Sequence, residues 1–406
     1  MIIRKIITAA FIAMAVISVG CGKREPAVAL TTEAYVWQPA ARSEVRQAMA
    51  EIGPALDALV VHAAEIRWTG KDFRVERRTK QADLPANCGL VVRIGSSAAA
   101  LDWTPEQIAP VAKLFKELAL SRPREIQCDF DCPQKRLAGY RRLLDALSRA
   151  AGKIPVVPTV LPSWMEETDF PSLVHGRAGY VLQVHSLHLP RNSSDPARVF
   201  DPQGARRAAQ TAARFRVPFR IAMATYGCEV WFDDRGKIID VISEDSPPSV
   251  EPAARSFAFA DPLASAALVR EWRARPPTGL RGIIWYRLPV RGDRRNWPEQ
   301  TFRKVINGEC EPATVVTEYE INDGTTDVFL TNHGAIPAKL PSEIVIGNAT
   351  IAGDGAGAYE FDSSSGEARL KLHSDVWPWL APGEKSAAGW VRIANGGERP
   401  QFLIKP

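Results

Sequence analysis

The stretch EIQCDFDCPQKRLAGYRRLLDALSRA, residues 125–150, places two aspartates one residue apart at the end of a short apolar run. Cys132 and Pro133 follow, and a helical pattern comes after them. The apolar residues of this pattern have the i, i+3, i+4, i+7 spacing of a helix that packs on one face; they are Leu137, Tyr140, Leu143, Leu144 and Leu147. The stretch therefore predicts a buried strand, a helix, and two carboxyl groups at the junction between them.

Seven other short apolar runs occur between residues 34 and 288, and helical patterns lie between most of them. The predicted strands are 34–38, 58–66, 89–95, 125–130, 154–161, 180–186, 219–226 and 279–288. The predicted helices are 43–58, 104–121, 133–152, 201–215 and 251–275, while 67–80 and 231–242 have the pattern of hairpins. This alternation predicts an α/β fold, a (β/α)8 TIM-like barrel. An open doubly wound sheet is the alternative, which the missing Gly-rich phosphate loop disfavours.

The pattern changes near residue 309. From there to residue 406 the chain consists of short alternating runs separated by turns such as Asn322-Asp323-Gly324. This pattern is typical of a small antiparallel β-sandwich. We therefore predict a barrel over 34–308 followed by a C-terminal β-sandwich over 309–406.

The N-terminus predicts export. Arg4 and Lys5 precede an apolar run over 6–19, which is shorter than the roughly 20 residues that a membrane-spanning helix needs. The run ends at Cys21 in a lipobox-like sequence, although Ser18 stands where a leucine is usual. We predict a signal peptide over 1–21, lipidation of Cys21, a tether over 22–33, and a protein anchored by its lipid in the bacterial cell envelope, facing the periplasm or at the outer membrane. An ordinary secreted protein is the alternative.

Composition excludes several partner classes. The formal net charge of +5 on 406 residues is spread over scattered basic doublets, and no nucleic-acid-binding motif accompanies them. No CxxC or HxxxH pair occurs, so the sequence predicts neither a metal site nor a bound cofactor. Cys128 and Cys132 would lie about 13 Å apart on one strand, too far for a disulfide. The only membrane contact that we expect is through the lipid anchor.

The phase of the strand at 126–130 decides what the paired aspartates do. Side chains alternate along a strand, so Gln127, Asp129 and Asp131 share one face and the apolar side chains share the other. The apolar face suits the helices, and the polar face then points into the barrel at its C-terminal mouth. Because active sites of this fold are built at that mouth, the aspartates are predicted to form the floor of a functional site.

Other predicted strand ends add residues of the kind that bind sugars. Aromatic faces stack on sugar rings, and charged or amide groups bond the hydroxyls. Two carboxyl groups about 5–9 Å apart are the usual minimum for glycoside hydrolysis. Asp131 is the predicted general acid/base, because a like charge nearby raises a carboxyl pKa. Asp129 is predicted to orient it and Glu65 to be a third carboxylate. The predicted substrate-binding residues are Trp37, Arg93, Trp164, Gln183, His185, Tyr226, Trp285 and Arg287.

Each of these residues also has a structural interpretation. Paired aspartates can bond loop amides and arginines, and Glu65 can be the ion-pair partner of a nearby arginine. His185 can be a hydrogen-bonded rim histidine, and Trp37 and Trp285 can be packing residues of the barrel.

The segment CDFDCPQKRLAGYRRLL resembles the hallmark of an uncharacterised bacterial family, a domain of unknown function, whose members are exported proteins with glycoside-hydrolase-like TIM barrels. LPSWM (161–165), LQVHSLHLP (182–190), ATYG (224–227) and GIIWYRLP (282–289) are similar to its other blocks. The resemblance implies a barrel over 34–308 but no established activity. A more distant likeness to chitinase-type barrels implies an Asp-x-Asp-x-Glu motif, and here Pro133 occupies the position of the catalytic glutamate.

Three functional hypotheses from different classes follow. The leading hypothesis is an exported carbohydrate-active protein, a glycoside hydrolase that uses the carboxylates at the end of the fourth strand and binds a polysaccharide or glycan. The alternative is a non-catalytic glycan-binding or envelope scaffold protein with a degenerate site, which Pro133 favours. A partner-binding module of an envelope complex is a third hypothesis, based on export and on the added sandwich alone.

Overall fold

The computed structural model describes residues 29–192, 195–243, 251–347, 350–364, 366–393 and 401–405. The predicted signal peptide, Cys21 and most of the predicted tether lie outside these ranges. The first strand begins at Thr31, ahead of the predicted start at 34. Within the described ranges, no helix combines the length and the apolar character that crossing a bilayer requires.

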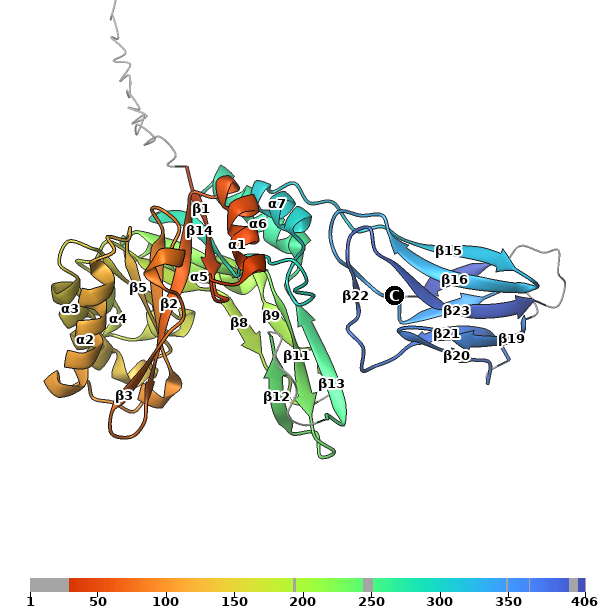
Figure 1. The fold of residues 1–406 in the computed structure, drawn as a ribbon, viewed down its shortest axis with the longest axis horizontal. Helices are drawn as coiled ribbons and strands as arrows, with labels where there is room; N and C mark the ends of the chain where they lie inside the picture. Colours follow the sequence, from red (N-terminus) through yellow and green to blue (C-terminus); the bar gives the residue numbers. More distant parts are fainter. Residues whose placement is uncertain are drawn as a thin grey trace, which may run out of the picture.

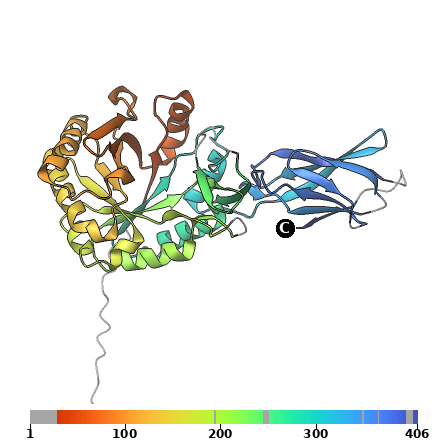
Figure 2. The same ribbon diagram turned by 90° about the horizontal axis from the view of Figure 1, so that it is seen from below.

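Eight parallel strands close into a barrel, as the sequence predicts (Figures 1 and 2). Each strand pairs with the next, and the last pairs with the first. The barrel strands are β1 (Thr31–Val36), β2 (Ala58–Trp68), β4 (Gly89–Ile94), β5 (Ile126–Phe130), β6 (Val156–Val160), β7 (Tyr180–Gln183), β10 (Phe219–Ala224) and β14 (Leu280–Tyr286).

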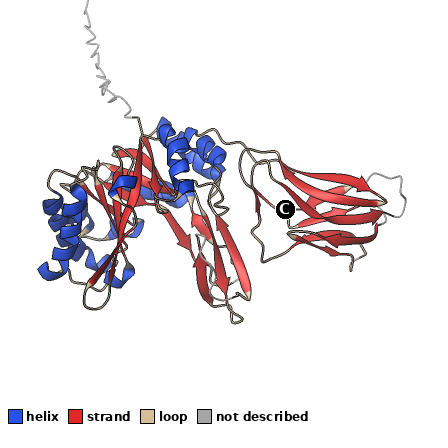
Figure 3. Ribbon diagram, viewed as in Figure 1, coloured by secondary structure: helices blue, strands red, loops and turns tan. Residues whose placement is uncertain are grey.

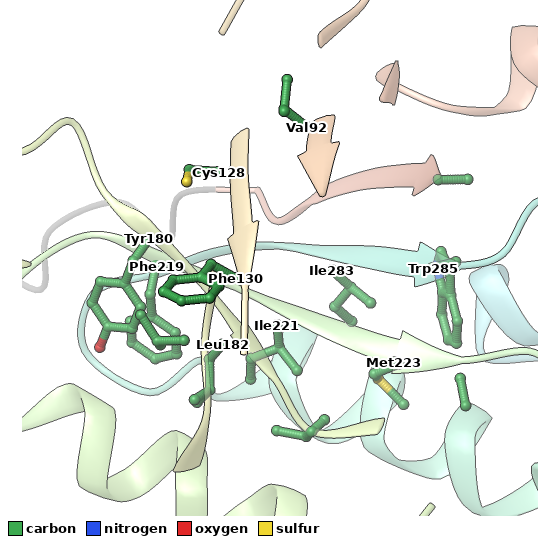
Figure 4. Close-up of a cluster of buried hydrophobic side chains, with 14 of the residues drawn as sticks. Val92, Cys128, Phe130, Tyr180, Leu182, Phe219, Ile221, Met223, Ile283 and Trp285 are labelled. Atoms are coloured by element: carbon green, nitrogen blue, oxygen red, sulfur yellow. The ribbon is translucent and has the colours of Figure 1, made fainter. Parts of the chain in front are cut away.

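Helices cover the outside of the barrel (Figure 3). They are α1 (Ser43–Ile52), α2 (Pro105–Ala119), α3 (Leu137–Ala151), α4 (Phe170–Val174), α5 (Pro202–Ala213), α6 (Pro262–Ala274) and α7 (Glu299–Asn307). Their starts follow local chemistry: Thr104 and Gln107 form a capping box at α2, and Asp201 and Asp261 accept amide hydrogen bonds at α5 and α6. The buried faces of the helices pack against outward-pointing strand residues such as Phe130 (Figure 4).

The residues inside the barrel show which face of each strand points inward. Seven strands each contribute one residue to an inner apolar cluster, namely Tyr35, Val60, Val91, Val157, Val181, Ala222 and Ile284. Strand β5 contributes Gln127 instead, whose side-chain oxygen accepts a hydrogen bond from the Tyr35 hydroxyl at 2.5 Å. The predicted inward phase of Gln127 is therefore confirmed, and Cys128 and Phe130 pack on the helix side, as predicted.

Three β insertions extend from the C-terminal end of the barrel (Figure 1). They are β3 (Phe73–Arg77), antiparallel to β2; the pair β8 (His185–His188) and β9 (Arg198–Phe200); and the sheet of β11 (Gly227–Phe232), β12 (Ile238–Ile242) and β13 (Ala254–Phe259). Both predicted hairpins are confirmed by β3 and by β11–β12. The helix predicted over 251–275 is wrong in its first part, because β13 pairs with β11 and places Phe257 and Phe259 against Trp377.

The C-terminal part is an antiparallel sandwich, as predicted. One sheet contains β15 (Val315–Asn322), β16 (Thr325–Asn332), β23 (Lys385–Ile393) and β19 (Thr350–Gly355); the other contains β20 (Tyr359–Asp362), β21 (Ala368–Leu372), β18 (Glu343–Ile346) and β24 (Phe402–Lys405). A short pair, β17 (Ala338–Lys339) and β22 (Trp379–Leu380), is separate. The two sheets share one apolar core that includes Val328, Ile344 and Leu370.

Candidate functional site

Asp129 lies at the mouth of the barrel and is enclosed by donors. It stands two residues after Gln127 on β5, so it points inward at the next level toward the C-terminal end. One of its oxygens accepts from the Thr159 hydroxyl at 2.9 Å and from the Gln183 amide at 2.8 Å. The other accepts from the Arg93 guanidinium at 3.1 Å. A carboxylate held by three donors is compensated for its burial and fixed in orientation.

Asp131 lies just beyond the end of β5 and is the accessible member of the pair. Its side chain is 51% exposed, against 5% for Asp129. Its only hydrogen bond among the described residues is a long one of 3.4 Å from Arg93. Desolvation at the mouth and the neighbouring Asp129 charge raise the pKa of Asp131, and Arg93 opposes them. A half-exposed carboxyl group with a raised pKa is suited to donate a proton.

Arg93 ties the two aspartates together. Its guanidinium contacts both carboxylates and lies over the ring of Trp37, 5.9 Å from the ring centroid. Desolvation lowers the pKa of Arg93, but the charges of Asp129 and Asp131 outweigh it and raise the pKa overall. Arg93 is therefore a permanent positive charge between two carboxyl groups, 39% exposed and open to a ligand.

Aromatic rings form one side of the mouth. Trp37 stacks on His62 at 4.3 Å and meets Tyr286 edge-on at 4.9 Å. His185 stacks on Tyr286 at 4.8 Å with the two rings nearly parallel, and Tyr226 packs edge-on against Tyr286 at 5.5 Å. Trp37, His185 and Tyr286 are each partly exposed. The strand ends thus place a continuous aromatic surface beside the carboxyl groups.

Both histidines of this surface are held neutral. Burial lowers the pKa of His62 to about 4 and the pKa of His185 to about 4; the Asp129 charge opposes burial at both sites. His62 is nearly completely buried, and its Nε2 has no hydrogen-bond partner among the described residues. At neutral pH these rings are therefore uncharged members of the aromatic surface.

Glu65 lies on the mouth side of the β2–β3 ribbon, but two arginines occupy it. One carboxylate oxygen accepts from Arg67 at 2.9 Å and the other from Arg78 at 2.7 Å. Burial raises the pKa of Glu65, and these two hydrogen bonds outweigh that effect and lower it. In this state Glu65 is the anion of a salt-bridge network, the structural alternative that the sequence left open.

Three predicted ligand-binding residues are buried and closed to a ligand. Trp164 is buried against Tyr140 in the helix layer, and Trp285 is completely buried against Trp297 on the outside of the barrel. Arg287 is buried and paired with Asp293 at 2.5 Å. The prediction that Trp285 and Arg287 lie on the inward face of β14 is therefore wrong. Parallel strands are buried on both faces, so the run GIIWYRL carries no alternation that would reveal which face is inward.

The structure adds three residues that the sequence did not single out. Tyr286 takes the mouth position that was predicted for Trp285, and Thr159 and His62 complete the layer. Thr159 and Tyr286 each lie two residues after a residue of the inner cluster on the same strand. They could have been predicted if the inward face of those strands had been known. His62 precedes a register shift between His62 and Ala64, which conceals the alternation of β2.

Cysteine and metal chemistry is not evident at the mouth. Burial raises the pKa of Cys128 to about 12 and the pKa of Cys132 to about 12, so both are protonated thiols. All five cysteines among the described residues are unbridged. Within the described ranges, no group of three or more His, Cys, Asp or Glu side chains is placed to hold a metal ion.

Fold and site together define a TIM-barrel protein with an appended β-sandwich and a carboxylate pair at the barrel mouth. The chain belongs to the family described as Domain of unknown function (DUF3142), which matches residues 87–291. A second Domain of unknown function (DUF8456) matches residues 315–394, within the sandwich. The resemblance to a family of uncharacterised activity is confirmed. The export of this chain stays a prediction.

Solved structures with a similar arrangement include several chitinases. A chitinase from Chromobacterium violaceum is 13% identical, with 70% of this chain and 100% of that chain covered and a TM-score of 0.48. A class V chitinase from Nicotiana tobaccum in complex with NAG4 is 11% identical, with 69% and 98% covered and a TM-score of 0.46. At these values the likeness carries no argument about chemistry. The comparison with curated proteins gave no match.

Proposed function

We propose that this protein hydrolyses a glycosidic bond at the barrel mouth, with Asp131 as general acid and base. The observation that carries the proposal is the unequal environment of the two aspartates. Asp129 is buried and bonded to three donors, whereas Asp131 is half exposed beside it with a raised pKa. Pairs of carboxyl groups in such different environments take different roles, one charged and one acidic.

In this proposal each carboxyl group has its own task. Asp131 donates its proton to the glycosidic oxygen as the bond to the anomeric carbon breaks. Asp129, which three donors hold in place, stabilises the positive charge that develops on the sugar ring. Water then adds to the anomeric carbon and returns a proton to Asp131, which restores the acid.

The aromatic surface supplies the binding energy. A pyranose ring placed on Trp37 or on the exposed edge of Tyr286 keeps its hydroxyls within the range of charged and amide groups. Arg93 and Gln183 are two such groups at the mouth, and both contact Asp129. Substrate recognition and proton transfer therefore use the same layer of strand ends.

The experiment is a hydrolysis assay of the wild type and Asp131→Asn on a panel of oligosaccharides, including the tetramer of N-acetylglucosamine. We expect the substitution to lower the rate by at least about 100-fold, the range of general acid catalysis. Saccharide affinity, measured by calorimetry, should change little. Equal rates in both proteins would remove Asp131 from the mechanism.

A second candidate is a glycan-binding protein that does not cleave its ligand. All three predicted carboxylates accept a hydrogen bond from an arginine, and Pro133 stands where the distant likeness would place a glutamate. Binding of an oligosaccharide without product release, at high protein concentration and long incubation, would support this candidate. Release of any product that Asp131→Asn abolishes would end it.

We also propose that the chain is exported and anchored in the bacterial envelope through Cys21. The support is the sequence of residues 1–21 alone. The wild type is expected in the membrane fraction, and Cys21→Ser in a soluble or secreted fraction. If the two proteins fractionate identically, the lipid anchor is excluded.

A further inference from the structure

A hollow of about 530 Å³ lies between the barrel and the sandwich, apart from the residues of the mouth. Helix α1, the loop after β14 and the first turn of α7 form its barrel side, and residues 377–384 form part of its sandwich side. The labels in Figure 1 place α1 and α7 on the side of the barrel that faces β22. The volume lies within the range of about 300–1,000 Å³ that is usual for small-molecule sites.

Two half-buried tryptophans give this hollow an aromatic wall. The rings of Trp377 and Trp379 lie 4.8 Å apart at 46°. Phe259, which also lines the hollow, packs against both rings, at 5.6 Å from Trp377 and 5.2 Å from Trp379. This packing fixes the rings before any ligand arrives, so little conformational entropy is lost on binding.

The hollow exists in a fixed form because direct contacts join the two domains around it. Arg294 pairs with Glu384 at 3.2 Å, and the Thr301 hydroxyl donates to the Ala335 carbonyl at 3.0 Å. Arg255 of β13 donates to the Asp375 carbonyl at 2.7 Å. These contacts come from three different barrel segments, so the sandwich is held at several points.

The polar groups of the lining carry both signs of charge. Arg291, Arg294 and Arg303 are donors, whereas Glu51, Glu299 and Glu384 are acceptors. Arg291 and Gln300 are exposed and have no hydrogen-bond partner among the described residues. Arg294 pairs with Glu384 at 3.2 Å and Arg303 with Glu299 at 2.7 Å, so much of the lining charge is already balanced. An anionic ligand would meet the carboxylates, a cationic ligand would meet the arginines, and an apolar segment would leave the Arg291 and Gln300 side chains without a partner.

We infer that this hollow is a second saccharide site, which takes a neutral oligosaccharide. Such a ligand presents an apolar ring face to Trp377 and Trp379 and hydroxyls that both donate and accept. The site is distinct from the mouth and does not depend on catalysis there. It would hold a glycan on the sandwich side of the barrel while the mouth engages the same or another chain.

The test is calorimetric titration of the full-length protein with two neutral probes, the tetramer of N-acetylglucosamine and cellotetraose. We expect Trp377→Ala to weaken binding of at least one probe at this site by tenfold or more, since large aromatic contacts dominate such sites. Arg291→Ala combined with Gln300→Ala should weaken it several-fold. Both of these residues are exposed, so the double variant tests the site even if Trp377→Ala fails to fold.

Asp131→Asn is the matched control, because it changes the mouth and leaves the hollow intact. It should retain binding at the hollow, and saccharide should slow amide hydrogen exchange over 289–300 and 377–384 in both proteins. The inference is overturned if the Arg291 and Gln300 double variant binds like the wild type, if protection is confined to the mouth, or if neither probe binds at about 10 mM, above the millimolar range of weak sites. Loss of hydrolysis alone would count only against the proposed function.

Discussion

The two ends of the barrel interior contain the same arrangement with different surroundings. At the N-terminal end, Arg220 lies between Glu33 and Glu125, at 2.6 Å from each. At the C-terminal end, Arg93 lies between Asp129 and Asp131, at 3.1 and 3.4 Å. We call the first group the floor triad and the second the mouth triad. Each is one arginine held by two carboxylates inside a ring of strands.

The two triads differ in how far they are closed to solvent. All three side chains of the floor triad are largely buried, and Glu125 also accepts from Gln127 at 2.6 Å, which continues the network to Tyr35. In the mouth triad Asp131 is half exposed and its contact is long. An arginine between two carboxylates is therefore structural when it is sealed, and it becomes a candidate for chemistry when one carboxylate is left accessible.

The largest expected effect is the loss of the floor arginine. Arg220→Met should lower the free energy of unfolding by about 3–5 kcal/mol, because it leaves two carboxylates buried without their partner. Burial already raises the pKa of Glu33 even with Arg220 present. Urea unfolding, followed by tryptophan fluorescence, measures the change.

Arg93→Met is the matched variant at the mouth. We expect a loss of only about 1–2 kcal/mol, because Asp129 keeps its bonds to Thr159 and Gln183 and Asp131 is solvated. Saccharide binding should weaken in this variant. If the two arginine variants lose equal stability, the contrast between a sealed floor and an open mouth is wrong.

A smaller effect concerns pH. The pKa of His62 in the folded state is about 4, below its usual 6.5, so the unfolded chain binds more protons between these values. The neutral His62 ring makes its full contribution to the free energy of unfolding above pH 6.5. This contribution is lost as the pH falls toward 4. His62→Phe should therefore reduce the loss of unfolding free energy between pH 7 and pH 4 by about 3 kcal/mol.

Unfolding curves of the wild type and His62→Phe at several pH values measure this difference. His185, whose pKa is lowered to about 4 as well, stays in both proteins, so the variant keeps part of the pH dependence. Parallel stability profiles for the two proteins would show that His62 is not buried in its neutral form.

The sequence was sufficient for the barrel and for one strand of the site. Eight short apolar runs located the eight barrel strands, and the Gln127-x-Asp129 alternation revealed the phase of β5 because polar residues interrupt an apolar strand. Strand β14 offered no such interruption, so Trp285 was assigned to the face that Tyr286 occupies. The inward face of a strand in a parallel barrel can be read from the sequence only where polar residues interrupt the apolar run.

Contacts between distant segments account for the other differences. Strand β13 was predicted as helix because its strand character depends on pairing with β11 and on the contact of its two phenylalanines with Trp377, more than a hundred residues later in the chain. The three donors that close Asp129 come from three different strands. The floor triad likewise brings together Glu33, Glu125 and Arg220, whose proximity follows from barrel closure and not from any local pattern.

The most direct test compares one carboxylate from each end of the barrel: glycan hydrolysis rates of wild type, Asp131→Asn and Glu125→Gln at equal concentrations of folded protein. We expect a rate at least about 100-fold lower for Asp131→Asn, and a wild-type rate with reduced stability for Glu125→Gln. An Asp131→Asn protein that turns over glycan as fast as the wild type would contradict the proposed role of Asp131.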